Sequence, residues 1–167
     1  MAELVDDFRS AFRGHPAGVA LITAATPEGP VGLTASSVAS VSIDPPTISF
    51  SVTKEGGSAG GVLQADSFVV HLLGEPHIPL ALAFSTPGAE RFTADQGWQT
   101  LETGEPHLPS APVAIRARAA EIVRAGSSRL VLAEVLSIHQ GPPSAPLVYQ
   151  NRRFHVLADS HAAEHDA

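Results

Sequence analysis

Apolar and hydroxyl side chains alternate along two consecutive stretches, residues 33–43 and 47–53. Because successive side chains of an extended chain point to opposite faces, this alternation predicts two strands, each with an apolar face and a hydroxyl face. The Pro45-Pro46 pair separates the two runs. The apolar faces comprise Leu33, Ala35, Ala39, Val41, Ile43, Ile48, Phe50 and Val52, and the hydroxyl faces Thr34, Ser36, Ser40, Ser42, Thr47, Ser49, Ser51 and Thr53.

If these strands are neighbours, their hydroxyl faces form one polar and uncharged wall. Each Ser or Thr can donate or accept a hydrogen bond, so the wall suits a flat ligand with several donors and acceptors and no charge on its ring. The pattern fits two ordinary strands with solvent-facing hydroxyls equally well. Both interpretations stay open on the alternation alone.

Hydrophobic periodicity predicts the other elements of the N-terminal half. Apolar residues recur at helical spacing from Leu4 to Phe12, which predicts an amphipathic helix over residues 3–13 that packs against the body of the protein. A strand is expected at residues 19–23, and the Pro-Glu-Gly-Pro cluster at 27–30 predicts the turn of a hairpin.

The middle of the chain contains fewer regular elements. Residues 68–73 are typical of a buried strand, and residues 78–84 of a short helix. Residues 86–112 are rich in Pro, Gly and polar side chains, with Trp98 and Leu101 as apolar anchors. We interpret that stretch as an irregular lid or a dimer-contact arm.

The C-terminal half is predicted to be mostly strand. Residues 113–123 contain good helix formers but also show a period of two, with Arg116 and Arg118 as a solvated stripe. Residues 129–138 are predominantly apolar and predict a strand buried on both faces, and residues 147–154 should close the fold.

Composition limits the function classes. A chain of 167 residues with 44% hydrophobic content can bury one core, so we expect one domain over 1–157 and a disordered tail over 158–167. The absence of cysteine excludes disulfides and thiolate chemistry, and the eight histidines predict no metal site. A net charge of −7 without a basic tract argues against nucleic acid, and the lack of a leader or long apolar run favours a cytoplasmic protein without a membrane partner.

A possible phosphate cradle follows the second hydroxyl strand. Lys54 is the only lysine, and four glycines surround Ser58 in the next seven residues. Free amides at a helix N-terminus attract anions, and Ser58 could cap a short helix whose apolar side includes Val62 and Leu63. The alternative is a flexible surface turn with a solvated lysine.

The run from Gly32 to Pro46, followed by a strand, a basic residue and a serine-containing loop, resembles the flavin reductase-like, FMN-binding split β-barrel family. Further parts of the likeness are Phe12 to Val19, Arg91-Phe92 and Pro146 to Tyr149. The resemblance implies a mainly β fold, namely a largely antiparallel, Greek-key-like split β-barrel with a few short flanking helices. It also implies a homodimer, and it favours strand over helix for 113–123.

The resemblance further implies a function and a site. The implied activity is NAD(P)H-dependent reduction of FMN, or of FAD, that supplies reduced flavin to a partner monooxygenase. The flavin would carry the hydride chemistry, so no side chain is required as an acid or base. The implied ring contacts are Thr34, Ala35, Ser36 and Ser37, the phosphate contacts are Ser51, Lys54 and Ser58, and the candidate substrate contacts are Arg91, Phe92 and Ser128.

The chain departs from the family pattern at three places. Gly126-Ser127-Ser128 stands where many reductases have Gly-Asp-His, a pair that helps to place the nicotinamide donor, so a flavin carrier with weak reductase activity is an alternative function. His71 replaces a common asparagine and is interpreted as a strand histidine. The phosphate loop is unusually rich in glycine. Arg91 and Phe92 could equally be an ordinary helix-end arginine and a core phenylalanine.

A serine hydrolase is the third alternative. Residues 56–60 match the G-x-S-x-G nucleophile elbow between a predicted strand and a helix, with Ser58 as nucleophile. Chain order would allow an acid and a later histidine to complete a triad. Against this, the chain is short for that fold and lacks the alternating helices of a parallel sheet. The candidate partners are Asp66 or Asp95 with His107, His139 or His155.

Overall fold

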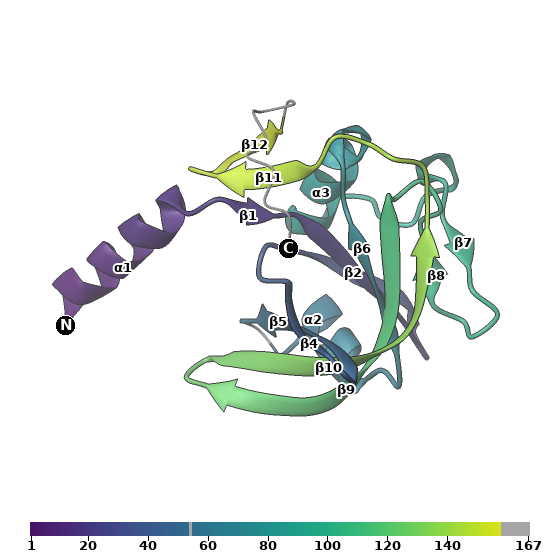
Figure 1. Cartoon of the computed structure of the whole chain (residues 1–167), viewed down its shortest axis with the longest axis horizontal. Helices are drawn as coiled ribbons and strands as arrows, with labels where there is room; N and C mark the ends of the chain where they lie inside the picture. Colours follow the sequence, from purple (N-terminus) through teal and green to yellow (C-terminus); the bar gives the residue numbers. More distant parts are fainter. Residues whose placement is uncertain (54, 158–167) are drawn as a thin grey trace.

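The computed structural model describes residues 1–53 and 55–157 as a strongly curved antiparallel sheet with short helices at its margins (Figure 1). Every strand pair in the seven-stranded sheet is antiparallel, which confirms the predicted mainly β fold. In spatial order the strands are β3 (Gly29–Ala35), β2 (Ala20–Thr26), β6 (Phe68–Leu72), β9 (Val113–Ala125), β10 (Ser128–Gln140), β5 (Pro46–Val52) and β4 (Ala39–Ile43).

Alternation along the strands builds the main core. Ile48, Phe50 and Val52 on β5 are buried, as the pattern predicted, and Phe50 packs edge to face on Phe68 with ring centroids 5.3 Å apart. The predicted hairpin between β2 and β3 is also confirmed, since Thr26 pairs with Gly29 across a two-residue turn. Gly29 has a φ of +123°, a backbone conformation that favours glycine.

The first hydroxyl run is not one continuous strand. The chain leaves the ladder at residues 36–38, so β3 ends at Ala35 and β4 begins at Ala39. Consequently the predicted apolar face is divided: Ala35 is buried, whereas Val41 and Ile43 are 53% and 89% exposed. The two hydroxyl runs are nevertheless neighbours, because β4 pairs with β5.

The N-terminal helix α1 (Ala2–Gly14) forms where it was predicted but does not pack against the body. Figure 1 shows it projecting from the sheet, and none of its residues is buried. Its apolar face includes Leu4, Phe8 and Phe12, which are between 61% and 71% exposed. The packing prediction is therefore wrong for a single chain, because periodicity identifies an apolar face without showing what covers it.

The two long strands near the C-terminus form a hairpin that extends beyond the rest of the sheet. Residues 113–123 form a strand rather than a helix, as the resemblance favoured. On β10, buried Val131 and Ala133 alternate with half-buried Leu132 and Glu134. Leu136 and Ile138 are 38% and 55% exposed. The prediction that 129–138 is buried on both faces is wrong, since nothing in the described part of the chain covers one face of this hairpin.

Smaller elements complete the described chain. A three-stranded sheet joins the two ends of the sequence, and the segment 86–112 is irregular, as predicted, apart from one 3-10 turn and one small hairpin. The remaining elements are α2 (Gly57–Gln64), η1 (Glu75–His77), α3 (Ile78–Ser85), η2 (Ala94–Gln96), β7 (Gln99–Thr100), β8 (Pro106–His107), β1 (Ala17–Gly18), β11 (Leu147–Gln150) and β12 (Arg153–Val156). The predictions for Lys54 and for the tail 158–167 lie outside the described residues.

Candidate functional site

Two adjoining cavities lie along the predicted ring-binding stretch. The larger has a volume of about 1030 Å³ and the smaller about 300 Å³, and both are lined by Ser36, Tyr149 and Arg152. Thr34 and Ala35 line the smaller cavity, whereas Ser37 and Ser51 line the larger. The structure thus brings five of the seven predicted cofactor residues to one place.

The hydroxyl groups at this place differ in what they contact. Thr34 Oγ1 donates to the carbonyl of Ala81 on α3 at 2.9 Å. Ser37 Oγ accepts from the Ser51 amide at 2.9 Å and donates to the Ser51 carbonyl at 3.3 Å. Within residues 1–53 and 55–157, the side-chain oxygens of Ser36 and Ser51 have no hydrogen-bond partner. Thr34 and Ser37 therefore hold the wall in place, while Ser36 and Ser51 can bind a ligand.

The bend between β3 and β4 adds backbone donors to the wall. Residues 36–38 lie outside both strand ladders, so their amides are not committed to strand pairing. Such amides can hydrogen-bond to a planar ring with several acceptors. This donor set is neutral, so it fits the uncharged polar edge of an isoalloxazine ring.

Aromatic and cationic side chains complete the walls of the larger cavity. Phe8 and Phe12 come from α1, and Tyr149 comes from β11. Arg9, Arg13 and Arg152 also line the cavity, and no carboxylate of residues 1–53 or 55–157 does. In a protein with a net charge of −7, this local surplus of positive charge favours an anionic ligand.

Sequence analysis missed Tyr149 and Arg152 as site residues. Tyr149 lies on β11 and Arg152 in the turn to β12, where Asn151 and Arg152 have φ values of +51° and +61°. The turn places the Arg152 side chain at both cavities. The asparagine before the two arginines was the only local signal, because Asn adopts positive φ more readily than most residues.

The second predicted subsite surrounds Ser58 at the start of α2. The N-cap of α2 is Gly56 and Ser58 lies inside the first turn, so the prediction that Ser58 caps the helix is wrong. Instead Ser58 Oγ lies 3.2 Å from Nη1 of Arg91, which donates to it. Arg91 also donates to the carbonyls of Gly32 and Thr86, both at 3.3 Å. The positively charged guanidinium group of Arg91 therefore lies beside Ser58.

Two of the glycines in this stretch, Gly60 and Gly61, are explained by close packing rather than by contact with a ligand. A Cβ at Gly60 would lie 2.2 Å from the carbonyl oxygen of Glu55, and one at Gly61 would lie 2.9 Å from a Val31 methyl carbon. Gly57 has a φ of +62°, which favours glycine at the helix entry. The glycine-rich sequence thus reflects the tight approach of α2 to its own loop and to β3.

The candidate substrate residues lie apart from the two cavities. Phe92 packs in a second core cluster, with its ring centroid 5.0 Å from those of Phe84 and Trp98. Ser128 lies at the tip of the β9–β10 hairpin, next to a turn in which Gly126 has a φ of +59°. Neither residue lines the cavities described above. Their role in substrate binding stays a prediction.

His71 is a buried strand histidine, as interpreted from the sequence. Its Nδ1 lies 3.0 Å from the Leu21 carbonyl, and its Nε2 accepts from the Leu108 amide at 3.0 Å. Burial lowers the pKa of His71 to about 3, so the ring is neutral at pH 7. The ring thus joins β2 and β6 to the irregular segment through Leu21 and Leu108.

The hydrolase alternative has no support in the geometry. Within the described part of the chain, Ser58 is hydrogen-bonded to Arg91 and to no histidine. The sheet is antiparallel rather than the parallel sheet of that fold.

No helix among the described residues has the length and apolar character needed to cross a bilayer.

Comparison with known proteins agrees with this site. The family model described as "Flavin reductase like domain" matches residues 12–158. An NADH:FMN oxidoreductase of Rhodococcus erythropolis is 37% identical over 153 residues, covering 89% of this chain and 80% of that protein. An NADH:riboflavin 5'-phosphate oxidoreductase of Streptomyces pristinaespiralis is 37% identical over 126 residues, covering 75% and 72%.

Solved structures give the same result. A flavin reductase domain protein from an Arthrobacter species superposes with a TM-score of 0.87 at 27% identity, covering 95% of this chain and 99% of that one. The styrene monooxygenase flavin reductase of Pseudomonas putida has a TM-score of 0.81 at 30% identity, covering 92% and 99%.

Fold and site together define a flavin-binding split β-barrel. The chain belongs to the flavin reductase family, as its match to the family model over most of its length shows. The predicted class of enzyme, a flavin reductase, is thereby confirmed.

Proposed function

We propose that this protein uses NADH to reduce FMN. The observation that carries the proposal is the convergence of Ser36, the free amides of 36–38, Tyr149 and Arg152 on two adjoining cavities. The relatives named NADH:FMN oxidoreductase support the choice of both nucleotides. FAD as acceptor and NADPH as donor are the alternatives that the experiment below separates.

The residues act by binding and orientation. The flavin, when bound, supplies the hydride-accepting ring, so the protein needs no acid or base of its own. Ser36 and the bend amides hold the polar edge of the ring, and Thr34, Ala35 and Ser37 shape the surface on which it lies. Ser51, Lys54 and Ser58 remain the proposed phosphate contacts, and Arg91 adds a charge beside Ser58. These assignments rest on the family resemblance and, for every residue except Lys54, also on its position in the fold.

A homodimer is part of the proposal. Leu4, Phe8 and Phe12 on α1 are exposed, as are Ile43 on β4 and Ile138 on β10. Exposed apolar surface spread over several elements favours a protein partner. A second copy would cover these faces and would enclose the larger cavity, one wall of which is α1.

Delivery of reduced flavin to a monooxygenase is the proposed biological role. The P. putida relative is the reductase of a styrene monooxygenase, which supports a partner of this class. Ser36 and Ser37 are exposed, so a bound flavin can leave the site without any unfolding of the protein. A cytoplasmic location belongs to the same proposal, because NADH is a cytoplasmic reductant.

Steady-state oxidation of NADH and NADPH, each with added FMN, FAD or riboflavin, tests the activity. We expect turnover with NADH and FMN, together with a change in the FMN absorption spectrum on binding. Tight FMN binding without turnover would favour the carrier, in which Ser127 and Ser128 cannot replace the Asp-His pair. Failure of the protein to bind any flavin would overturn both functions.

A further inference from the structure

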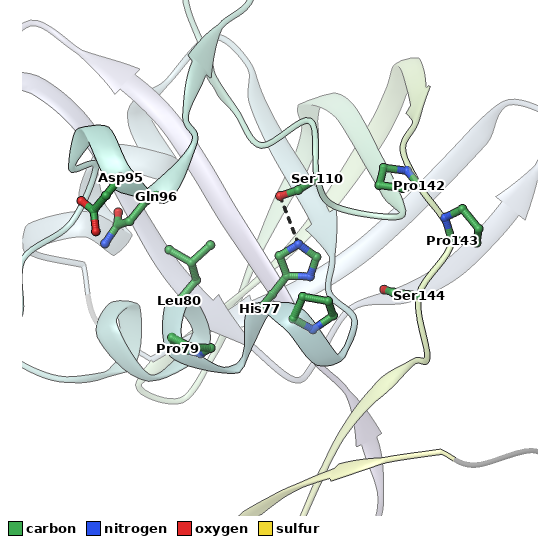
Figure 2. Close-up of a pocket in the computed structure, with 10 residues that line it drawn as sticks. His77, Pro79, Leu80, Asp95, Gln96, Ser110, Pro142, Pro143 and Ser144 are labelled. Atoms are coloured by element: carbon green, nitrogen blue, oxygen red, sulfur yellow. Dashed lines mark hydrogen bonds between the residues drawn. The ribbon is translucent and has the colours of Figure 1, made fainter.

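A separate cleft of about 540 Å³ shares no lining residue with the two flavin cavities. Pro79 and Leu80 of α3 line this cleft, whereas Leu82 and Ser85 of the same helix line the smaller flavin cavity. Figure 2 shows Pro142 and Pro143 on one side of the cleft and Pro79 and Leu80 on the other, with His77 between them. The walls are therefore rigid, flat and largely apolar.

The floor of the cleft is a neutral hydrogen-bonding pair. His77 is buried, and its Nδ1 accepts from the Gly74 amide at 3.2 Å. The same Nδ1 lies 3.2 Å from the Gly74 carbonyl, and Nε2 lies 3.2 Å from Ser110 Oγ, so each ring nitrogen has a hydrogen-bond partner in either neutral tautomer. Burial lowers the pKa of His77, so the ring stays uncharged at pH 7. Because a hydroxyl has one donor and two acceptor positions, Ser110 keeps hydrogen-bonding capacity toward the cleft with either tautomer of His77.

Ser144 provides a second polar atom that has no protein partner. Its hydroxyl oxygen is buried and makes no hydrogen bond within residues 1–53 and 55–157. Two neighbouring contacts fix this position. Gly74 packs so closely that a Cβ there would clash with the Ser144 oxygen at 1.8 Å, and the Glu75 amide donates to the carbonyl of the next residue, Ala145, at 2.9 Å. A buried hydroxyl without a protein partner needs one from outside the chain, either a water molecule or a ligand atom.

Charge selects the kind of ligand. Asp95 lines the cleft, and a hydrogen bond from the Thr93 side chain lowers its pKa, so it is anionic at neutral pH. Among the described residues that line the cleft there is no arginine, in contrast to the larger flavin cavity. A nucleotide phosphate is therefore repelled here. An uncharged aromatic compound with a hydroxyl group matches both the proline faces and the serine hydroxyls.

We propose that this cleft binds a small uncharged aromatic alcohol, and that its occupancy is coupled to the flavin site through α3. The coupling has a direct structural path, because Thr34 Oγ1 donates to the Ala81 carbonyl on that helix at 2.9 Å. A ligand that shifts α3 changes the position of Thr34, and by reciprocity flavin changes the affinity of the cleft. Only the coupling rests on the proposed function.

The fluorescence of Trp98 can report binding at this cleft. Trp98 is the single tryptophan, and its Nε1 donates to Oε1 of Gln96, a residue of the cleft rim, at 2.9 Å. Titration with benzyl alcohol, without flavin or NADH, should change the Trp98 fluorescence in a saturable manner. Benzoate has the same ring with a negative charge and should bind at least about tenfold more weakly. No saturable change, or equal affinity for the two compounds, would overturn the proposal.

Two variants locate the ligand. Ser144→Ala should weaken benzyl alcohol by about fivefold, and it loses no protein hydrogen bond. Ser110→Ala should do the same. Ser137→Ala, whose hydroxyl lies 3.3 Å from His139 Nε2 on β10, is the matched control and should bind like the wild type. Unchanged affinity in both the Ser144 and the Ser110 variant would exclude the cleft.

The coupling is tested separately. Saturating FMN should change the benzyl alcohol affinity by at least about twofold, and Thr34→Val should remove that change. Bound FMN without any such change would overturn the coupling and leave the cleft intact. If FMN does not bind at all while benzyl alcohol does, the proposed function fails rather than the cleft.

Discussion

The side chain of Ser37 is joined to the backbone of Ser51 in both directions, accepting from its amide at 2.9 Å and donating to its carbonyl at 3.3 Å. This contact fixes the bend between β3 and β4 against β5. The preceding residue, Ser36, is exposed and lies where the two flavin cavities meet. Adjacent serines therefore have different tasks: Ser37 holds the wall, and Ser36 is free to bind the ring.

Alanine variants at these two serines separate the tasks. Ser37→Ala should lower the free energy of unfolding by about 1 kcal/mol, because two backbone groups lose their partner. Ser36→Ala should leave stability within about 0.5 kcal/mol but weaken FMN binding by about fivefold. Urea denaturation and FMN titration measure the two quantities. Equal stability loss in both variants would contradict this division.

The phosphate contact is tested by comparing two flavins. Lys54→Ala should weaken FMN by about tenfold, since a charge-assisted hydrogen bond is lost, and should change riboflavin binding little, because riboflavin has no phosphate. Arg153→Ala removes a positive charge from an exposed position on β12 and serves as the control. An equal loss for FMN and riboflavin would remove Lys54 from the phosphate site.

Much of the strand content could be predicted because alternation is a local property of the sequence. The break at residues 36–38 could not, because it depends on Ser37 reaching Ser51, which lies fourteen positions further along the chain. Arg116 was also misjudged: the sequence pattern suggested a solvated stripe, but this residue pairs with buried Glu105 at 2.7 Å. Arg118 does lie at the surface, paired with Glu134 at 2.7 Å.

The site shows the same limit of local patterns. The stretch from Thr34 to Ser37 lies at the cavities, as the resemblance implied. Tyr149 and Arg152 reach them from the other end of the chain through the β1–β11 pairing, and nothing near Thr34 in the sequence indicates that contact. Hydrophobic periodicity likewise found the apolar faces of α1 and β10 but not whether they are covered.

The apolar face of α1 predicts the assembly state. Leu4→Glu places a charge on this face and should weaken the proposed dimer by about tenfold or more. Ser10→Glu adds the same charge on the opposite side of α1 and should leave the dimer intact. Sedimentation velocity over a range of concentrations measures both. A wild-type protein that stays monomeric at high micromolar concentration would contradict the dimer.

Glu105 anchors the irregular segment through a buried ion pair. It is 2% exposed and accepts from Ser67, Thr103 and Arg116; burial raises its pKa, but these hydrogen bonds outweigh burial and lower it. Glu105→Gln should therefore cost about 3 kcal/mol, because Arg116 loses its counter-charge. Adding Arg116→Met should recover part of that loss. Thermal unfolding of the single and double variants gives the comparison, and additive losses would contradict a paired network.

The buried ring of His71 predicts a pH dependence of stability. Its pKa falls from 6.5 in the unfolded chain to about 3 in the fold, so between these values only the unfolded state binds this proton. Stability should be full above pH 6.5 and fall toward pH 3, by up to about 1.4 kcal/mol per pH unit from this group.

Urea denaturation at several pH values tests this slope against a variant. His71→Asn keeps a donor for the Leu21 carbonyl and has no titrating ring, so its stability should fall less steeply between pH 6.5 and pH 3. His155→Gln alters an exposed ring and should keep the wild-type slope. If the wild type and His71→Asn lose stability in parallel between pH 6.5 and 4, the buried neutral histidine is not the cause of the pH dependence.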